Sequence, residues 1–110
     1  NKESLLESNS TLLKKFGTSI SPDHRFENVI VVEPVSIGKN CEIKNSIIGP
    51  NVAVGDNTTI NYSIVKDSII GSYADLFDIV LEDSLIGSDT EVKGETRSLN
   101  IGDNTEIDLG

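Results

Sequence analysis

Two side chains in this sequence are reactive enough for catalysis near neutral pH. His24 is the only histidine, and its imidazole could serve as a general base. It follows Pro22-Asp23 in a stretch that is typical of a connection, so we expect an ordinary surface or packing residue. Cys41 is the only cysteine and cannot form an internal disulfide. We expect it to be a buried small side chain, because no histidine lies near it in sequence to activate a thiolate.

Three aspartates stand at repeated positions, directly after a glycine or one residue later: Asp56, Asp89 and Asp103. Carboxylates that gather in space can hold a metal ion. The regular placement of these three instead favours turn residues whose side chains bond to the backbone. The sequence therefore predicts no catalytic, cofactor-binding or metal-binding residue.

An internal repeat dominates the sequence. An aliphatic residue followed by glycine occurs at Ile37-Gly38, Ile48-Gly49, Val54-Gly55, Ile70-Gly71, Ile86-Gly87 and Ile101-Gly102. Four residues after each aliphatic stands a small or β-branched residue: Cys41, Val52, Thr58, Ala74, Thr90 and Thr105. This is a hexapeptide pattern of aliphatic, glycine, two free positions, small residue and one free position. Such a pattern predicts a solenoid.

The sequence also repeats with a longer period of 15 to 17 residues. Five aliphatic residues are separated by 17, 16, 16 and 15 positions: Ile37, Val54, Ile70, Ile86 and Ile101. Three hexapeptides would give 18, so each period is one triangular coil of three short strands with tightened corners. The fold class is all-β: a parallel β-helix in which these five side chains form one interior ladder and Ala74 and Thr90 point inward. Coils about 4.8 Å apart would give five coils a length of about 24 Å.

The first residues predict a short N-terminal α-helix. Leu5, Leu6, Leu12, Leu13 and Phe16 recur at helical spacing. This apolar stripe either covers part of the same domain or packs against a domain that precedes it. We divide the chain into a helix at 1–17, a linker at 18–28 and a β-helix domain at 29–110.

Composition limits the partners. The chain has 18 acidic and 9 basic side chains, and its net charge of −9 disfavours nucleic acid and anionic membrane surfaces. The longest apolar run, residues 29–32, is too short to span a bilayer, and no basic and apolar leader opens the chain. We expect a cytoplasmic protein.

Apolar residues also fall on the outer faces of the expected prism. They are Ile47, Ile64, Ile69, Ile79 and Leu85, together with the aromatic residues Tyr62, Tyr73 and Phe77. Aromatic surface is enriched at protein interfaces. We therefore predict a homo-oligomer with Tyr73, Leu76 and Phe77 near its contact surface.

The hexapeptides resemble those of left-handed β-helix proteins, and this resemblance implies a left-handed coil. Within that superfamily, residues 2–13 are similar to the helix that closes the catalytic domain of glucose-1-phosphate thymidylyltransferases. Residues 33–38 resemble the entry to the β-helix of those enzymes, and residues 82–87 and 99–104 resemble the closing coils of their long forms.

The resemblance implies a C-terminal assembly and regulatory domain, joined to its own N-terminal nucleotidyltransferase domain. The parent transferase would join a sugar-1-phosphate to a nucleoside triphosphate with Mg²⁺ and release pyrophosphate, as a step of nucleotide-sugar biosynthesis. No residue here matches the family's nucleotide-binding loop or metal-binding aspartates, so we expect an inactive fragment without a cofactor. Two alternatives stay open: an acyl-CoA-dependent hexapeptide acyltransferase, which would need a histidine within the coils, and a stand-alone structural module.

Overall fold

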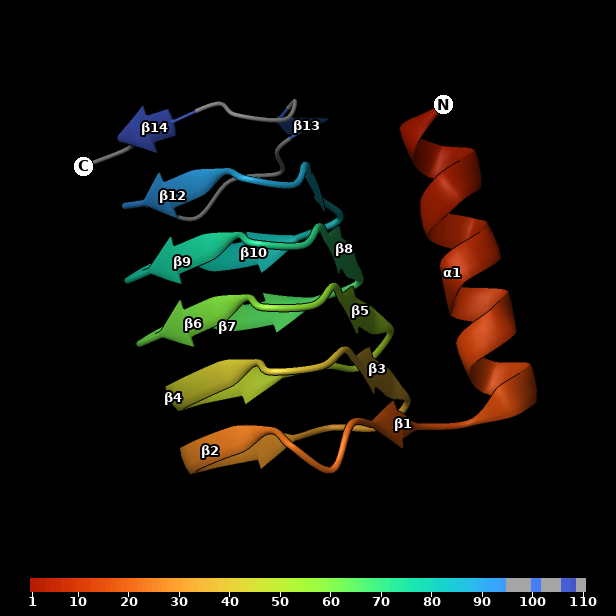
Figure 1. The fold of residues 1–110 in the computed structure, drawn as a ribbon. Helices are drawn as coiled ribbons and strands as arrows, with labels where there is room; N and C mark the ends of the chain where they lie inside the picture. Colours follow the sequence, from red (N-terminus) through yellow and green to blue (C-terminus); the bar gives the residue numbers. More distant parts are fainter. Residues whose placement is uncertain (95–99, 102–105, 109–110) are drawn as a thin grey trace.

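The computed structural model describes residues 1–94, 100–101 and 106–108. One helix, α1 (Lys2–Phe16), precedes a stack of short parallel strands (Figure 1). The strands are β1 (Ser19–Ile20), β2 (Arg25–Val31), β3 (Val35–Ile37), β4 (Glu42–Ile48), β5 (Val52–Val54), β6 (Thr59–Asn61), β7 (Ile64–Lys66), β8 (Ser68–Ile70), β9 (Asp75–Phe77), β10 (Val80–Glu82), β11 (Leu85–Ile86), β12 (Glu91–Lys93), β13 (Asn100–Ile101) and β14 (Glu106–Asp108).

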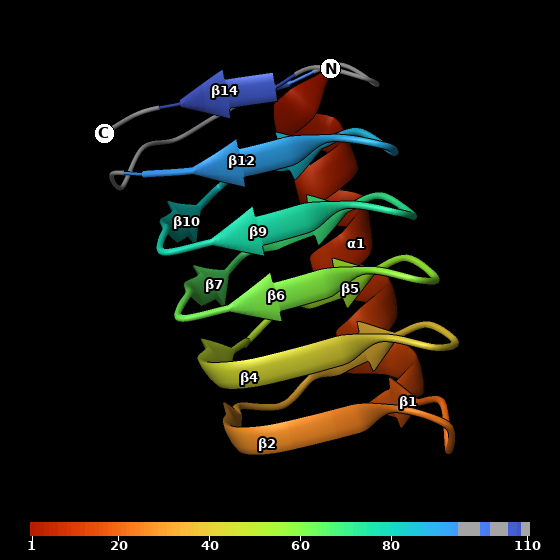
Figure 2. The same ribbon diagram turned by 60° about the vertical axis from the view of Figure 1, so that its left-hand side comes forward.

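The strands form the three faces of a prism (Figures 1 and 2). Face 1 is the sheet β1-β3-β5-β8-β11-β13. Face 2 contains the first halves of β2 and β4 with β6, β9, β12 and β14, and face 3 contains their second halves with β7 and β10. The two long strands change face at Asn28 and Asn45. Both residues have a positive φ, 55° at Asn28 and 51° at Asn45. The predicted parallel β-helix of triangular coils is confirmed.

The interior ladder lies where the repeat predicts it. Ile37, Val54, Ile70 and Ile86 pair in register along face 1 and are at most 4% exposed. Ile101 pairs with Ile86 through the backbone, but its side chain lies outside the described residues. The predicted ladder is therefore confirmed for its four described members.

The small positions of the hexapeptide are also buried. Cys41, Thr58, Ala74 and Thr90 are each at most 2% exposed. Glycine follows the aliphatic because the coils approach closely there: a Cβ on Gly55 would lie 2.6 Å from the backbone nitrogen of Ser72. The inward placement predicted for Ala74 and Thr90 is confirmed.

The corners are built mainly from asparagine and aspartate with positive φ. These residues tolerate the left-handed conformation, and their side chains can bond between coils. Asn40 donates to Asn57 at 2.7 Å, Asn28 to Asn45 at 2.8 Å and Asn51 to Asp67 at 3.0 Å. Each of the three corners therefore carries hydrogen bonds along the stack as well as within a coil.

Residues 18–28, which we expected to be a linker, belong to the first coil. β1 pairs with β3, and β2 pairs with β4 over its whole length. The expectation was wrong because Ile20-Ser21 takes the place of the aliphatic-glycine pair, so the hexapeptide signal is lost while the strand remains. A Thr18 hydroxyl that accepts from the amide of Val35 at 3.2 Å further ties this coil to the next.

Helix α1 packs along the outside of face 1, against β5 and β8 (Figure 1). The side chain of Asn1 caps its start by accepting from the amide of Ser4 at 2.8 Å, and Gly17 caps its end after Phe16. Leu13 is buried, and the outward-facing Ile69 of β8 is only partly exposed. The helix thus covers one side of a parallel sheet, the arrangement that such sheets normally require.

Candidate functional site

His24 lies on the surface of the first coil. Its Nδ1 is 2.7 Å from the carbonyl oxygen of Ser21, and its ring contacts Phe26 at a centroid distance of 4.2 Å. Because a carbonyl only accepts, Nδ1 donates, and in the neutral ring Nε2 then keeps its lone pair. The ring is exposed to solvent, as expected of a surface residue.

Cys41 is fully buried, which confirms the predicted small interior side chain. Its Sγ donates to the carbonyl oxygen of Gly55 at 3.1 Å. Burial raises the pKa of the thiol, and the charge of Asp56 adds to this effect. Both causes disfavour the thiolate, the form that acts as a nucleophile.

The repeated aspartates serve the corners. Asp56 accepts from the amide of Lys39 at 2.7 Å, and Asp89 occupies a corner with φ 57. Asp103 lies outside the described residues. Across residues 1–94, 100–101 and 106–108, no group of three or more histidine, cysteine and carboxylate side chains is placed to hold a metal ion.

Asp23 extends this corner pattern into the first coil. Its carboxylate accepts from the hydroxyl of Ser21 at 2.6 Å and from the amide of Asn40 at 3.0 Å. These two hydrogen bonds lower the pKa of Asp23, that from Ser21 most. Asp23 is thus a structural carboxylate that joins the first coil to the second.

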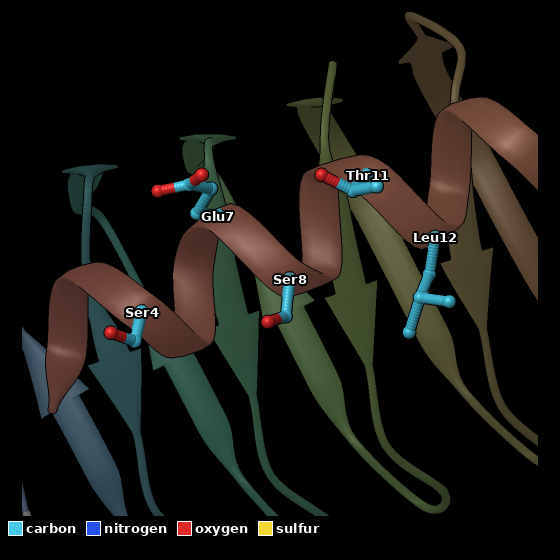
Figure 3. Close-up of a pocket in the computed structure, with 5 residues that line it drawn as sticks. All are labelled: Ser4, Glu7, Ser8, Thr11 and Leu12. Atoms are coloured by element: carbon cyan, nitrogen blue, oxygen red, sulfur yellow. The ribbon is translucent and has the colours of Figure 1, made fainter.

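The outer side of α1 exposes large apolar side chains. Leu5, Leu12 and Phe16 are 53%, 54% and 73% exposed. A shallow groove runs beside this stripe, lined by Ser4, Glu7, Ser8, Thr11 and Leu12. In Figure 3, Ser4, Ser8 and Leu12 project from one side of the helix, away from Glu7 and Thr11. The helix therefore has one apolar side against face 1 and a second one that the described residues leave open.

Face 3 exposes a second apolar row. Ile30, Ile47, Ile64 and Val80 pair in register on consecutive strands. Ile30 is 60% exposed and Ile64 is 41% exposed. We call these four residues the face 3 row. Ile30, Ile47 and Ile64 of this row line a groove that also includes Tyr62.

Ile79, which we expected on an outer face, is 1% exposed. It directly precedes Val80 and takes the inward corner position that Ser63 takes one coil earlier. The prediction was wrong because side chains of a strand alternate in direction, so an error of one residue reverses the face.

Of the three residues predicted near a contact surface, two are exposed and one is buried. Tyr73 and Phe77 are 63% and 47% exposed, whereas Leu76 is fully buried between Ile60 and Val92 of the neighbouring coils. Leu76 therefore cannot lie on a contact surface, since it is the leading aliphatic of its hexapeptide. A role for Tyr73 and Phe77 in contacts between copies stays a prediction.

Face 2 carries a polar groove that the sequence reasoning missed. Its lining residues come from β6, β9 and β12: Thr59, Asn61, Asp75, Phe77, Glu91 and Lys93. Burial, and then the charge of Glu91, raise the pKa of Asp75. The one available signal was the aromatic Phe77 at a position that is polar in the other coils.

Comparison with known proteins identifies relatives of this architecture. The family model described as "GlmU-like, C-terminal hexapeptide" matches residues 7–74, which is more than half of the chain. A hexapeptide-repeat containing acetyltransferase from Vibrio cholerae matches with a TM-score of 0.61 and 13% identity, over 97% of this chain and 86% of that one. These matches support the left-handed coil that the resemblance implied.

A second solved structure is more distant. The H141N mutant of perosamine N-acetyltransferase from Caulobacter crescentus, in complex with CoA and GDP-perosamine, matches with a TM-score of 0.41 and 18% identity. The match covers 91% of this chain and 62% of that chain. No curated protein matched the sequence. At these identities the likenesses concern the fold alone.

Proposed function

We propose that this chain, which belongs to the family of GlmU-like C-terminal hexapeptide domains, is the assembly and regulatory domain of a sugar-1-phosphate nucleotidyltransferase. The parent enzyme would resemble glucose-1-phosphate thymidylyltransferases. It would join a sugar-1-phosphate to a nucleoside triphosphate and release pyrophosphate, with Mg²⁺ held by its own catalytic domain. A reducing cytoplasm suits the one cysteine, which is free and buried.

The observation that carries this proposal is the two-sided helix. Leu13 of α1 is buried, while Leu5, Leu12 and Phe16 form an apolar stripe on the open side. A helix at the surface of a protein normally turns a polar side to water. An N-terminal nucleotidyltransferase domain of the same chain is the occupant that we propose for this stripe, and residues 2–13 resemble the helix that closes such a domain.

Assembly would use face 3. The face 3 row is flat and repeats the same kind of side chain once per coil, so a second copy can bury it along its length. Closed symmetry would let every copy bury its row. We therefore propose a homo-oligomer that is held together through Ile30, Ile47, Ile64 and Val80.

The test of the proposed activity uses the natural full-length protein. Incubation with sugar-1-phosphates, nucleoside triphosphates and Mg²⁺ should release pyrophosphate, and the 110-residue chain alone should release none. A natural gene that encodes no nucleotidyltransferase domain beside this one would contradict the proposal and favour a stand-alone structural module.

An acyltransferase is the second candidate, and the geometry of His24 favours it. The hydrogen bond from Nδ1 to Ser21 leaves Nε2 free to act as a general base. The solved structures that are similar in fold include acetyltransferases. Release of free thiol from acetyl-CoA in the presence of amino sugars, abolished by His24→Ala, would establish this activity. Against it, the sequence has no histidine other than His24.

A further inference from the structure

Two tyrosines occupy corners where the other coils have asparagine or aspartate. Tyr62 has φ 52 and Tyr73 has φ 56. The residues that correspond to Tyr62 are Asn28, Asn45 and Asp78, and those that correspond to Tyr73 are Asn40, Asn57 and Asp89. The left-handed conformation is unfavourable for a bulky side chain and is retained at sites where the side chain has a function.

Phe77 is a third anomaly, and it lies beside Tyr62. Its in-register positions on face 2 are otherwise polar: Glu27, Lys44, Asn61 and Lys93. The rings of Tyr62 and Phe77 meet edge to face with their centroids 5.9 Å apart, and both side chains are about half exposed or more. An exposed aromatic pair thus stands at the edge of a polar face, where β6 and β9 end. These two strands are neighbours on face 2 (Figure 2).

The polar side chains next to this pair are free to bind a ligand. Elsewhere on face 2, Arg25 pairs with Glu42 and Lys44 with Glu27, and within the groove Lys93 pairs with Glu91. The side chains of Thr59, Asn61 and Asp75 form no hydrogen bond or ion pair with any residue that the structure describes, yet all three line the groove with Phe77. The groove therefore offers hydroxyl and amide donors together with a carboxylate acceptor.

We infer that the face 2 groove binds a sugar ring that carries no phosphate, with the sugar against Phe77 and its hydroxyls bonded to Thr59, Asn61 and Asp75. Tyr62 lies at the edge of the groove, where its contact with Phe77 holds that ring in place and extends the apolar surface. An aromatic ring offers apolar surface to the C–H side of a sugar, while hydroxyls need both donors and acceptors. The groove holds two carboxylates, Asp75 and Glu91, against one cation, Lys93, which pairs with Glu91 at 3.4 Å. The remaining negative charge disfavours a phosphate. This ligand is distinct from the sugar phosphates of the proposed parent, and the inference does not depend on that function.

Titration of the isotope-labelled chain with methyl glycosides tests the site. Methyl glucoside, methyl galactoside, methyl mannoside and the methyl glycoside of N-acetylglucosamine serve as probes, and glucose-1-phosphate serves as the charged comparison. At least one uncharged glycoside should produce saturable amide shifts at Asn61, Asp75 and Phe77. Glucose-1-phosphate should bind about tenfold more weakly or not at all, because of charge repulsion.

Variants that copy the neighbouring coil separate binding from folding. Tyr62→Asn and Phe77→Asn introduce the residues found at Asn45 and Asn61, so the fold should tolerate both. Each should weaken glycoside binding by about tenfold or more, since an aromatic contact is lost. Tyr73→Asn is the matched control: it removes a tyrosine of the same backbone conformation and similar exposure, but one outside the groove and outside the aromatic pair of Tyr62 and Phe77, and binding should be unchanged.

Three outcomes would overturn the inference. No saturable shift with any of the four glycosides would exclude the site. Equal losses of binding in all three variants would show that the effect does not arise in the groove. A fall in oligomeric mass in Tyr62→Asn and Phe77→Asn, without any sugar binding by the original chain, would make this surface a protein interface. Pyrophosphate release by the full-length protein is a separate measurement, so failure of the two proposals can be distinguished.

Discussion

Faces 1 and 3 have aliphatic side chains on their outer sides, but among the described residues only face 1 has a covering element, α1. Ile69 lies on the side of face 1 where α1 packs, whereas Ile30 and Ile64 remain exposed on face 3. The inner sides of both faces follow the same hexapeptide rule. The hexapeptide repeat therefore determines which side chains fill the interior of the prism. It does not constrain the outward residues, so each face can pack against a different element or partner.

The largest effect should come from a cavity in the shared interior. Leu76→Ala removes a fully buried side chain that is stacked between two coils, and we expect a loss of about 2–5 kcal/mol of stability. Denaturant unfolding measures it. Phe77→Ala, one residue away but outward, is the control and should cost far less; equal losses would contradict the assigned directions.

Overpacking of the interior should have the next largest effect. Ala74→Leu adds volume at a position that is 2% exposed, and we expect a loss of about 1–3 kcal/mol. A thermal melt gives the shift. An unchanged melting temperature would show that the corner next to Ala74 has room that the packing does not suggest.

A charge on each face tests the comparison directly. Ile69→Asp puts a carboxylate under α1 and should lower the stability of a single chain by about 1–3 kcal/mol. Ile64→Asp places it on the open face 3 row and should leave unfolding of the monomer within about 0.5 kcal/mol, while it disrupts the proposed oligomer. Light scattering at several concentrations gives the mass. An unchanged oligomer in Ile64→Asp would exclude the face 3 row as its interface.

The smallest effect concerns the charge of Asp75. Its pKa in the folded chain is raised, so the folded state binds the proton more tightly than the unfolded state does. Stability should therefore fall as pH rises from the ordinary value of 3.8 through the raised pKa. Asp75→Asn should remove this loss and raise the melting temperature at pH 7 by about 1–2 °C, with little change at pH 3. A lower melting temperature at pH 7 would contradict the sign.

The sequence predicted the parts of the fold that repeat. The aliphatic-glycine pairs indicated the interior ladder and the small positions, and the buried Cys41 followed from its place in the hexapeptide. That His24, which lies on the first coil, has no catalytic role remains a prediction.

The features that the sequence did not predict lie where the hexapeptide repeat is irregular, or at positions that the repeat leaves free. The first coil escaped notice because Ile20-Ser21 lacks the glycine. The direction of Ile79 was wrong because a shortened corner moves the alternation of side chains by one residue. Leu76 was wrongly placed near a contact surface although it follows the regular hexapeptide as a leading, inward aliphatic. The face 2 groove lies outside the motif altogether, since its residues occupy the free positions of the hexapeptide and are brought together only by stacking of the coils.

Because α1 packs along face 1, the length of the helix has to match the height of the stack of coils, although the two are encoded in separate parts of the chain. A helix of 15 residues is about 22 Å long, whereas β1 to β11 covers four coil spacings, or about 19 Å. Duplication of one coil would lengthen the prism by about 4.8 Å and leave fresh aliphatic surface on face 1 in water unless the helix gained about three residues. Changes in coil number during evolution would therefore be tolerated only together with matching growth or loss at the start of the chain.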